Sequence, residues 1–314
     1  MTEPLVSVVI PTYNRAAIVV RALETVFAQR EDNLQVIVVD DASTDDTETR
    51  IRRAYGDRVQ YVRNDVRRGP GAARNRGLEL ATGPYVAFLD SDDLWLEEKL
   101  QRQVALVARG ADIVYCTALL VDLSGRVIAI QRARTRGDLR RPLLGRNVIA
   151  GSASAVLVRR SCLEAVGGFQ TGVYSEDWDL WLRLSFRFQF DFVPEPLVQI
   201  TIDPSSRHRA APADALAESL ERIYDGLLAD PASARFVRQH RPILRAGIEY
   251  ATAAQHRSFG ETADAFRRFL RCVTAKPFQA RAYAALMLLP MGRAALRRAR
   301  SLRSTLLFGR FNGR

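Results

Sequence analysis

The first hundred residues alternate short apolar runs with segments in which apolar residues recur at helical spacing. The run at residues 6–10 is almost entirely β-branched, as expected of a strand that is buried on both faces, and the run at 36–39 predicts a second buried strand. Two further strands are predicted at residues 59–62 and 85–89. Helices are predicted between them, including residues 16–29 and 71–80. Because strands joined by helices imply right-handed crossovers, the pattern predicts an α/β fold with a Rossmann-like, mostly parallel sheet flanked by helices.

The pattern changes after about residue 110. Strand-like runs at 113–115 and 155–158 are separated by polar, glycine-containing connections, which favours a mixed or antiparallel extension of the sheet. A short amphipathic helix is predicted over residues 175–187. Beyond about residue 205 the pattern is mostly helical. We therefore expect a sheet domain over residues 1–205 and a helical C-terminal region over residues 206–314.

Polar side chains follow three of the predicted strands at the point where each strand ends. They lie at residues 12–14, 40–41 and 90–93. Ligands of parallel α/β sheets bind beyond the carboxyl ends of the strands. The sequence therefore predicts a binding site at this edge of the sheet.

The glycine-rich stretch at residues 69–74 does not carry the fingerprint of a common phosphate-binding loop. It follows the third strand and lacks both the GxGxxG spacing and a Walker lysine, which argues against a Rossmann dehydrogenase and a P-loop ATPase. A diphosphate ligand would then be neutralised most simply by Mn²⁺ or Mg²⁺, which prefer carboxylate and phosphate oxygens. Asp90 and Asp92 supply such carboxylates. The alternative is that they only cap the following helix.

Five motifs follow one another along the chain. They are PTYNR at 11–15, VDDASTD at 39–45, GAARN at 71–75, FLDSDD at 88–93 and SEDWDLW at 175–181. In order and spacing this series resembles the family 2 inverting glycosyltransferases, which have the GT-A fold. The resemblance covers roughly residues 5–205 and implies that this domain binds a nucleotide sugar and catalyses its transfer.

The resemblance also implies how a nucleotide would be held. The strand-end clusters would contact the base and ribose, and Asp41 would accept a hydrogen bond from the imide N–H of the base. Arg74 would lie near the diphosphate or order Asp90 and Asp41. Asp90 would touch the ribose or a metal-bound water, and Asp92 would ligate the metal. The implied donor-binding residues are Pro11, Thr12, Tyr13, Asn14, Asp41, Arg74 and Asp90.

By the same resemblance, Asp177 matches the catalytic base and Glu176 would bind the acceptor or assist. A carboxylate in this position can take the proton of the attacking hydroxyl, and direct attack inverts the anomeric centre. Burial and the like charge of Glu176 would raise the pKa of Asp177. The alternative is a capped surface helix whose Trp178 and Trp181 simply pack in the core.

A third metal ligand is less clearly marked. Many members of the family carry a histidine shortly after the base helix. Here Asp203 stands in the matching stretch and His208 follows five residues later, so either side chain is a candidate ligand. The alternative is that Asp203 and the proline after it only form a turn.

The implied activity is metal-dependent, inverting transfer of a sugar from a nucleotide diphosphate sugar, first a UDP-sugar, to an acceptor hydroxyl. The acceptor would be a saccharide or a lipid-linked saccharide in the synthesis of bacterial cell-envelope polysaccharide or glycolipid. Three alternatives remain. They are an inactive nucleotide-sugar-binding scaffold or sensor, a nucleotidyltransferase and a nucleic-acid-binding protein.

The net charge of +11 arises from the C-terminal third. Residues 207–314 contain 20 basic and 8 acidic residues. From about residue 288, apolar residues recur at spacings of three and four beside arginines, which predicts a basic amphipathic helix suited to an anionic membrane surface. The alternative is a helix that packs on the protein and exposes its arginines. No helix-turn-helix, zinc-finger or RNP pattern is present, so we expect no specific nucleic-acid partner.

Three widely spaced cysteines form no metal-binding pattern and indicate buried free thiols in a reducing compartment. No apolar stretch is long enough to span a bilayer, and no basic segment typical of a signal peptide precedes the first strand. We therefore expect a cytoplasmic protein that is peripheral at the inner face of the cytoplasmic membrane.

Overall fold

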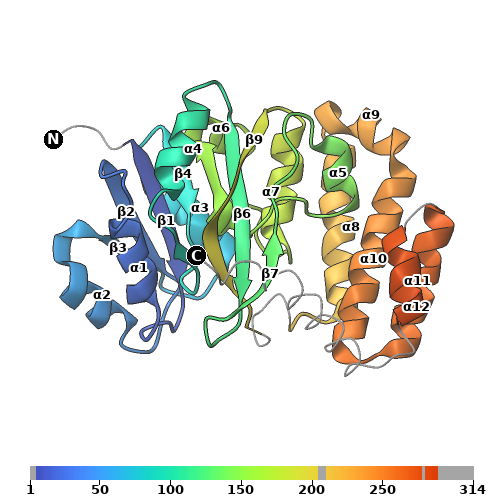
Figure 1. Ribbon diagram of the computed structural model, residues 1–314, viewed down its shortest axis with the longest axis horizontal. Helices are drawn as coiled ribbons and strands as arrows, with labels where there is room; N and C mark the ends of the chain where they lie inside the picture. The colour runs from blue at the N-terminus through green and yellow to red at the C-terminus, as the bar shows by residue number, and fades with distance from the viewer. Residues whose placement is uncertain (1–4, 204–209, 278–279, 289–314) are drawn as a thin grey trace, which may run out of the picture. The chain divides into compact units, whose positions relative to one another are not determined.

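The computed structural model describes residues 5–203, 210–277 and 280–288 (Figure 1). The chain divides into two compact units. The sheet unit comprises residues up to 140 and residues 148–202, and the helical unit comprises residues 141–147 and the chain from residue 203. His208 and the basic tail beyond residue 288 lie outside the described residues, so their predicted roles stay predictions.

The sheet unit is an α/β fold, as the sequence predicts. Its described residues form nine strands in the order β3-β2-β1-β4-β8-β6-β9-β5, with β7 paired to β6. Six of these nine run in one direction, while β8, β5 and β7 run in the other, so the sheet is mostly parallel with the predicted mixed extension. The strands are β1 (Val6–Thr12), β2 (Leu34–Asp40), β3 (Gln60–Arg63), β4 (Tyr85–Phe88), β5 (Leu94–Trp95), β6 (Ile113–Val121), β7 (Val127–Gln131), β8 (Val156–Arg159) and β9 (Phe190–Thr201).

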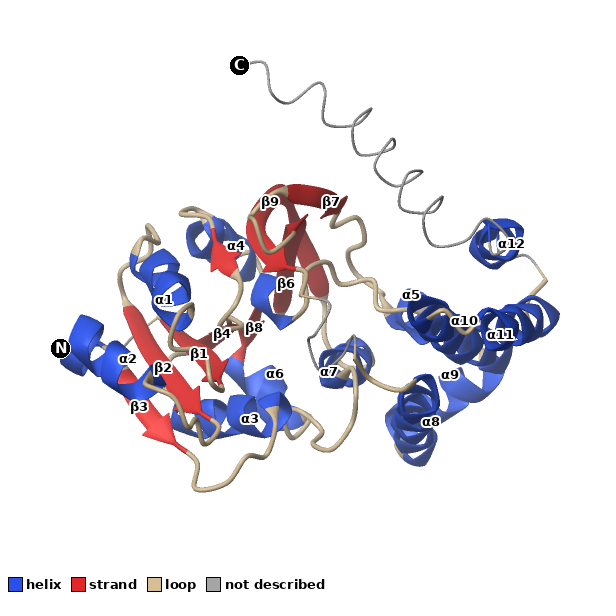
Figure 2. Cartoon of the chain, turned by 90° about the horizontal axis from the view of Figure 1, so that it is seen from below, coloured by secondary structure: helices blue, strands red, loops and turns tan. Residues whose placement is uncertain are grey.

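Helices cover both faces of this sheet. Figure 2 shows α1 and α4 on one face and α3 and α6 on the other. Of these helices, α1 connects β1 to β2 and α3 connects β3 to β4. The strands of each pair run in the same direction, so these two crossovers return the chain to the same end of the sheet. The helices of this unit are α1 (Val19–Phe27), α2 (Thr47–Tyr55), α3 (Pro70–Leu80), α4 (Lys99–Val107), α6 (Arg160–Ala165) and α7 (Glu176–Ser185).

The central strand β1 is buried along its whole length, which explains its continuous apolar sequence. Val6, Val8 and Ile10 pack into the core that α1 and α4 cover. Val9 points to the opposite face, where α3 approaches so closely that a Cβ added at Gly77 would lie 2.2 Å from Val9 Cγ1. Gly77 therefore fixes the distance between α3 and the sheet.

The helical unit contains α8 (Ala213–Ala229), α9 (Pro231–Gln239), α10 (Arg241–Phe259), α11 (Thr262–Ala275) and α12 (Ala280–Leu288). Its core includes Ala253, Phe269 and Cys272. The short helix α5 (Arg140–Gly145) packs into this unit, where Leu143 and Leu144 are fully buried. The predicted sheet domain over residues 1–205 includes residues 141–147, whereas the contacts of this segment lie in the helical unit.

The sequence pattern predicts no strand over residues 190–201, where β9 is the longest strand of the described sheet. Cys116, Cys162 and Cys272 are free and buried, as predicted. Among the described residues, no helix is both long and apolar enough to cross a membrane.

The close approach of α3 to β1 predicts a sensitive position. Replacing Gly77 with Ala should lower the free energy of unfolding by about 1–3 kcal/mol, because the new methyl overlaps Val9. In chemical denaturation, a Gly77→Ala/Val9→Ala variant should lose less stability than the two single variants together. Additive losses, within about 0.5 kcal/mol, would show that the Val9 contact is not the cause.

Candidate functional site

The carboxyl ends of β1 and β2 are joined by hydrogen bonds. The backbone N–H of Asp41 donates to the carbonyl of Thr12 over 2.9 Å. Asn14 adopts a left-handed conformation with φ of 52°, which asparagine tolerates better than most residues. Its N–H donates to Ser43 Oγ over 2.8 Å, and its side-chain oxygen accepts from the Thr44 N–H over 2.7 Å. The first two predicted clusters therefore form one surface.

Asp41 organises the loop that leads into α3. Its buried carboxylate accepts from Asn64 Nδ2 at 3.0 Å, from the Arg68 N–H at 2.9 Å and from the Gly69 N–H at 2.6 Å. A carboxylate offers about four acceptor positions, so three are used by this loop. Asp41 can thus hold the loop and still offer an oxygen to a ligand.

The residues predicted to lie along the base and ribose belong to β1 and the turn after it. Pro11 pairs with Val39 in the sheet, and Thr12 is buried with its hydroxyl unpartnered among the described residues. The Tyr13 ring is partly exposed, and the Arg67 guanidinium lies 4.0 Å from its centroid. A flat aromatic ring beside a cation suits stacking of a base and attraction of phosphate.

Arg74 connects three segments at the centre of the site. Its buried guanidinium donates to Asp90 Oδ1 over 2.6 Å and to Glu176 Oε1 over 3.2 Å. Burial alone would lower the pKa of Arg74, but Asp90 and Glu176 raise it, so the guanidinium remains charged. Among the described residues its Nε has no hydrogen-bond partner. Arg74 therefore brings α3, the end of β4 and the start of α7 together.

Asp177 lies in the first turn of α7, beside this cluster. The helix begins after Ser175, which has a left-handed φ of 62°. Burial, and next the negative charge of Glu176, raise the pKa of Asp177 to about 6, although the Trp178 N–H donates to its Oδ1 at 2.7 Å. A carboxylate of this pKa is charged at neutral pH and is a stronger base than an ordinary aspartate.

The rest of α7 anchors this turn. Trp178 and Trp181 are buried, which is the packing that the alternative reading of this segment expects. The buried Asp179 accepts from Arg183 Nη2 at 2.6 Å, and Arg183 also donates to the carbonyls of Val166 and Gly168. The same helix thus supplies core packing and presents Asp177 at its first turn.

Three aspartates follow β4. Asp92 accepts from Arg15 Nη2 at 3.3 Å, and its side chain is partly exposed. Asp93 is buried, where it accepts from Ser154 Oγ at 2.7 Å and from the Thr201 N–H at 2.9 Å. Burial, and next the charges of Asp90 and Asp92, raise the pKa of Asp93 well above its ordinary value. The Asp93 side chain therefore fixes the turn, while the side chains of Asp90 and Asp92 stay partly exposed.

The donor set fits a divalent cation. Asp90 and Asp92 present hard carboxylate oxygens from side chains that are about a quarter exposed. The described residues contain no group of three or more His, Cys, Asp or Glu side chains ready to hold a metal, so ligand phosphates or water would complete its coordination. Asp203, a candidate third ligand, belongs to the helical unit.

Residues that the sequence analysis did not assign also support the site. Ser154 accepts from the Asp90 N–H at 3.0 Å while donating to Asp93, and Thr201 donates to the carbonyl of Asp92 at 2.5 Å. Both lie far from the three aspartates in the chain. No local pattern marks them, since Ser154 precedes β8 and Thr201 ends β9, and the contacts form only when these distant strands have joined the sheet.

The comparison with protein families gives the identity of this arrangement. The model of glycosyl transferase family 2 matches residues 7–167, just over half of the chain. The chain belongs to glycosyl transferase family 2. The match contains the strand-end clusters, Arg74 and the three aspartates, and it ends before α7.

Curated relatives of this family 2 glycosyltransferase include enzymes of polysaccharide synthesis. An uncharacterized glycosyltransferase of Rickettsia prowazekii is 29% identical over 233 residues, covering 71% of this chain and 70% of the relative. WfgD of Escherichia coli, a UDP-Glc:α-D-GlcNAc-diphosphoundecaprenol β-1,3-glucosyltransferase, is 28% identical over 188 residues, covering 59% and 71%. The succinoglycan biosynthesis protein ExoO of Rhizobium meliloti is 40% identical over 124 residues, covering 39% and 36%.

Solved structures share the fold of this family 2 protein. Staphylococcus aureus TarS 1–349 in complex with UDP-GlcNAc has a TM-score of 0.64 at 20% identity and covers 97% of this chain and 92% of its own. The mannosyltransferase PcManGT of Pyrobaculum calidifontis, in complex with GDP-Man and Mn²⁺, has a TM-score of 0.59 at 19% identity and covers 100% and 89%. At this identity the likeness shows a common GT-A fold.

The buried position of Arg74 predicts a large effect of its removal. Arg74→Gln leaves the charges of Asp90 and Glu176 without their partner and should lower the free energy of unfolding by about 2–4 kcal/mol. Arg76→Gln is the matched control on the same helix, because the Arg76–Glu79 pair is exposed and should contribute less than about 0.5 kcal/mol. The measurements are thermal and chemical denaturation. If Arg74→Gln and Arg76→Gln lost the same free energy of unfolding, the central role of Arg74 would be contradicted.

Proposed function

We propose that this glycosyltransferase moves a sugar from a nucleoside diphosphate sugar, first a UDP-sugar, to an acceptor hydroxyl with inversion. The observation that carries the proposal is Asp177, a carboxylate of raised pKa beside the Arg74, Asp90 and Glu176 cluster. In this position Asp177 would serve as a base next to the groups that would bind the diphosphate.

The donor would lie along the joined ends of β1 and β2. Thr12, Tyr13 and Asn14, with Pro11 behind them, would contact the base and ribose, and Asp41 would accept from the base. Arg67 and Arg74 supply positive charge for the diphosphate. Asp92, with Asp90, would hold Mn²⁺ or Mg²⁺. When bound, such a cation stabilises the negative charge that develops on the leaving diphosphate.

Asp177 would take the proton of the acceptor hydroxyl as that oxygen attacks the anomeric carbon. One base and direct displacement give inversion, because the nucleophile enters opposite the leaving diphosphate. Glu176, held by Arg74, would position the acceptor and keep the pKa of Asp177 high. Asp203 and His208 stay candidate further metal ligands.

We further propose that the acceptor is a saccharide or a lipid-linked saccharide of the bacterial envelope. The proposal is supported by two relatives: WfgD, which is named for a diphosphoundecaprenol-linked acceptor, and ExoO, which is named for succinoglycan biosynthesis. A peripheral position at the cytoplasmic membrane, with the basic segment from residue 288 at an anionic surface, would give access to such an acceptor.

The raised pKa of Asp177 predicts a pH profile. Because only the deprotonated carboxylate accepts a proton, kcat/KM should rise with pH through an inflection near 6 and then level off. Glu176→Gln removes a like charge and should move the inflection to lower pH. Steady-state rates from pH 4.5 to 8.5 provide the measurement. An unchanged inflection in Glu176→Gln would contradict this source of the raised pKa.

The activity itself is tested with a panel of nucleotide sugars in Mn²⁺, Mg²⁺ or EDTA. Release of one nucleoside diphosphate should require the metal and fall by at least about 100-fold in Asp92→Ala and Asp177→Asn.

Asp177→Asn also has a stability signature. The folded-state pKa lies above the unfolded one, so the charged carboxylate destabilises the fold at neutral pH and this cost disappears below about pH 4. The variant should therefore be more stable than wild type at pH 7.5 by about 1–2 kcal/mol.

If no nucleoside diphosphate bound in the presence of metal, the catalytic assignment would fail. Binding without transfer in any acceptor mixture would favour a scaffold or sensor.

A further inference from the structure

A hollow of about 440 Å³ lies within the helical unit, between the segment 141–147 and α10 to α12. Four cationic side chains line it, those of Arg141, Arg146, Lys276 and Arg281. Ile243 and Tyr250 form apolar parts of its wall, and none of the described lining residues is acidic. We call this feature the basic hollow. Its volume is within the range of about 300–1,000 Å³ that is usual for small-ligand sites.

The charges of the basic hollow have no acidic partner in the part of the chain that the structure describes. Among the described residues, no carboxylate forms an ion pair with any of its four cations. Burial, and next the like charge of Arg281, lower the pKa of Arg146. Arg281 also lies over the Tyr250 ring, 5.3 Å from its centroid. An anion in the hollow would relieve this repulsion.

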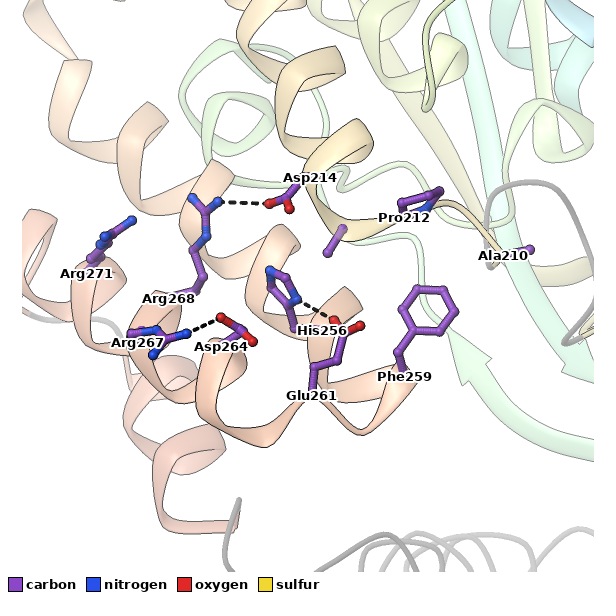
Figure 3. Close-up of a pocket in the computed structure, with 11 residues that line it drawn as sticks. Ala210, Pro212, Asp214, His256, Phe259, Glu261, Asp264, Arg267, Arg268 and Arg271 are labelled. Carbon is purple, nitrogen blue, oxygen red and sulfur yellow. Dashed lines mark hydrogen bonds and ion pairs between the residues drawn. The ribbon is translucent and has the colours of Figure 1, made fainter.

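A second hollow of the same unit shows what neutralisation looks like (Figure 3). It is lined by several charged residues, and two of its three arginines have carboxylate partners within the hollow, while no ion pair joins Arg271 to a described residue. Arg268 pairs with Asp214 over 3.4 Å, Arg267 pairs with Asp264, and His256 Nδ1 lies 2.6 Å from Glu261. The basic hollow differs because, among the residues with a described placement, none of its four cations has such a partner.

The segment that carries Arg141 and Arg146 is held firmly against α10. Leu144 is fully buried, and its carbonyl accepts from the Tyr224 hydroxyl over 2.7 Å. A Cβ added at Gly247 would lie 3.0 Å from the carbonyl oxygens of Leu144 and Gly145, so only glycine permits this approach without strain. The two arginines are thus positioned by packing rather than by an exposed loop.

We propose that the basic hollow binds the phosphate groups of an amphiphilic phosphate ligand. Arginine guanidinium groups match phosphate oxygens in charge and geometry, and two or more can share a diphosphate. Ile243 and Tyr250 provide apolar surface for the group that the phosphate carries. Assigning this ligand as the lipid diphosphate of the acceptor rests on the proposed function. The phosphate headgroups of membrane lipids offer the same chemistry.

The test uses the full chain in EDTA, which suppresses metal-dependent diphosphate binding at the sheet unit. The probes are farnesyl diphosphate in neutral detergent micelles, inorganic pyrophosphate, and phosphatidylcholine vesicles with and without phosphatidylglycerol. The hollow variant is Arg146→Gln/Arg281→Gln. The matched control is Arg235→Gln/Arg238→Gln, which removes the same charge from exposed positions of α9.

Wild type and control should bind farnesyl diphosphate alike, and the hollow variant should bind at least about tenfold more weakly, since two of the phosphate-facing cations are gone. The same difference with pyrophosphate would locate the recognition in the phosphates. A difference seen only with phosphatidylglycerol vesicles would assign the site to membrane headgroups. Equal losses in both variants, or no binding of any probe, would overturn the proposal.

Two further controls separate the hypotheses. A single-stranded oligonucleotide that loses more affinity in the hollow variant than the phosphate probes do would overturn the proposal in favour of nucleic acid. Binding of nucleoside diphosphates with Mn²⁺ should be unchanged in the hollow variant. If wild type lacked that binding, the proposed donor site would fail, while the result in EDTA would still decide the basic hollow.

Discussion

One buried guanidinium joins the segments that carry the proposed catalytic groups. Arg74 reaches Asp90 at the end of β4 and Glu176 at the start of α7, which are far apart in the sequence. The positive charge of Arg74 is stable in the interior because the carboxylates of Asp90 and Glu176 pair with it. These carboxylates in turn tolerate partial burial because they pair with the guanidinium. Asp177 depends on this balance, since its pKa follows from burial, Glu176 and Arg74 together.

Around Arg74 and its two carboxylate partners, hydrogen bonds stabilise the loop before α3 and the turn after β4. Asp41 accepts hydrogen bonds from the loop before α3, and this loop fixes the start of the helix that carries Arg74. On the other side, Ser154 and Asp93 secure the turn from which Asp90 and Asp92 emerge. The buried Asp93 thus secures the turn, while Asp90 and Asp92 keep partly exposed carboxylates. Such support holds reacting groups in place before substrate arrives, which electrostatic catalysis requires.

The sequence predicts β1 and β2 well, because strands that are buried on both faces are continuously apolar. It also predicts β3 and β4, although no residue of the edge strand β3 is buried. It does not predict β9, in which Pro194 and Pro196 interrupt the apolar pattern and the pairing with β6 shifts register near them. The motifs indicate Asp90, Asp92 and Asp177 directly. Ser154 carries no such mark, since its contact with Asp90 spans 64 positions and exists only once the antiparallel strands have formed. The same limit applies to the two leucines of α5, a short apolar pair without periodicity.

The excursion of residues 141–147 makes the two units interleaved rather than consecutive. The chain passes from one unit to the other after residues 140, 147 and 202, and Leu143 and Leu144 complete a core whose other members come much later. A single genetic crossover near residue 205 would separate the helical unit from part of its own interior. Exchange of the helical unit between relatives therefore requires the short internal segment to travel with it, which ties the variation of the two units together over evolution.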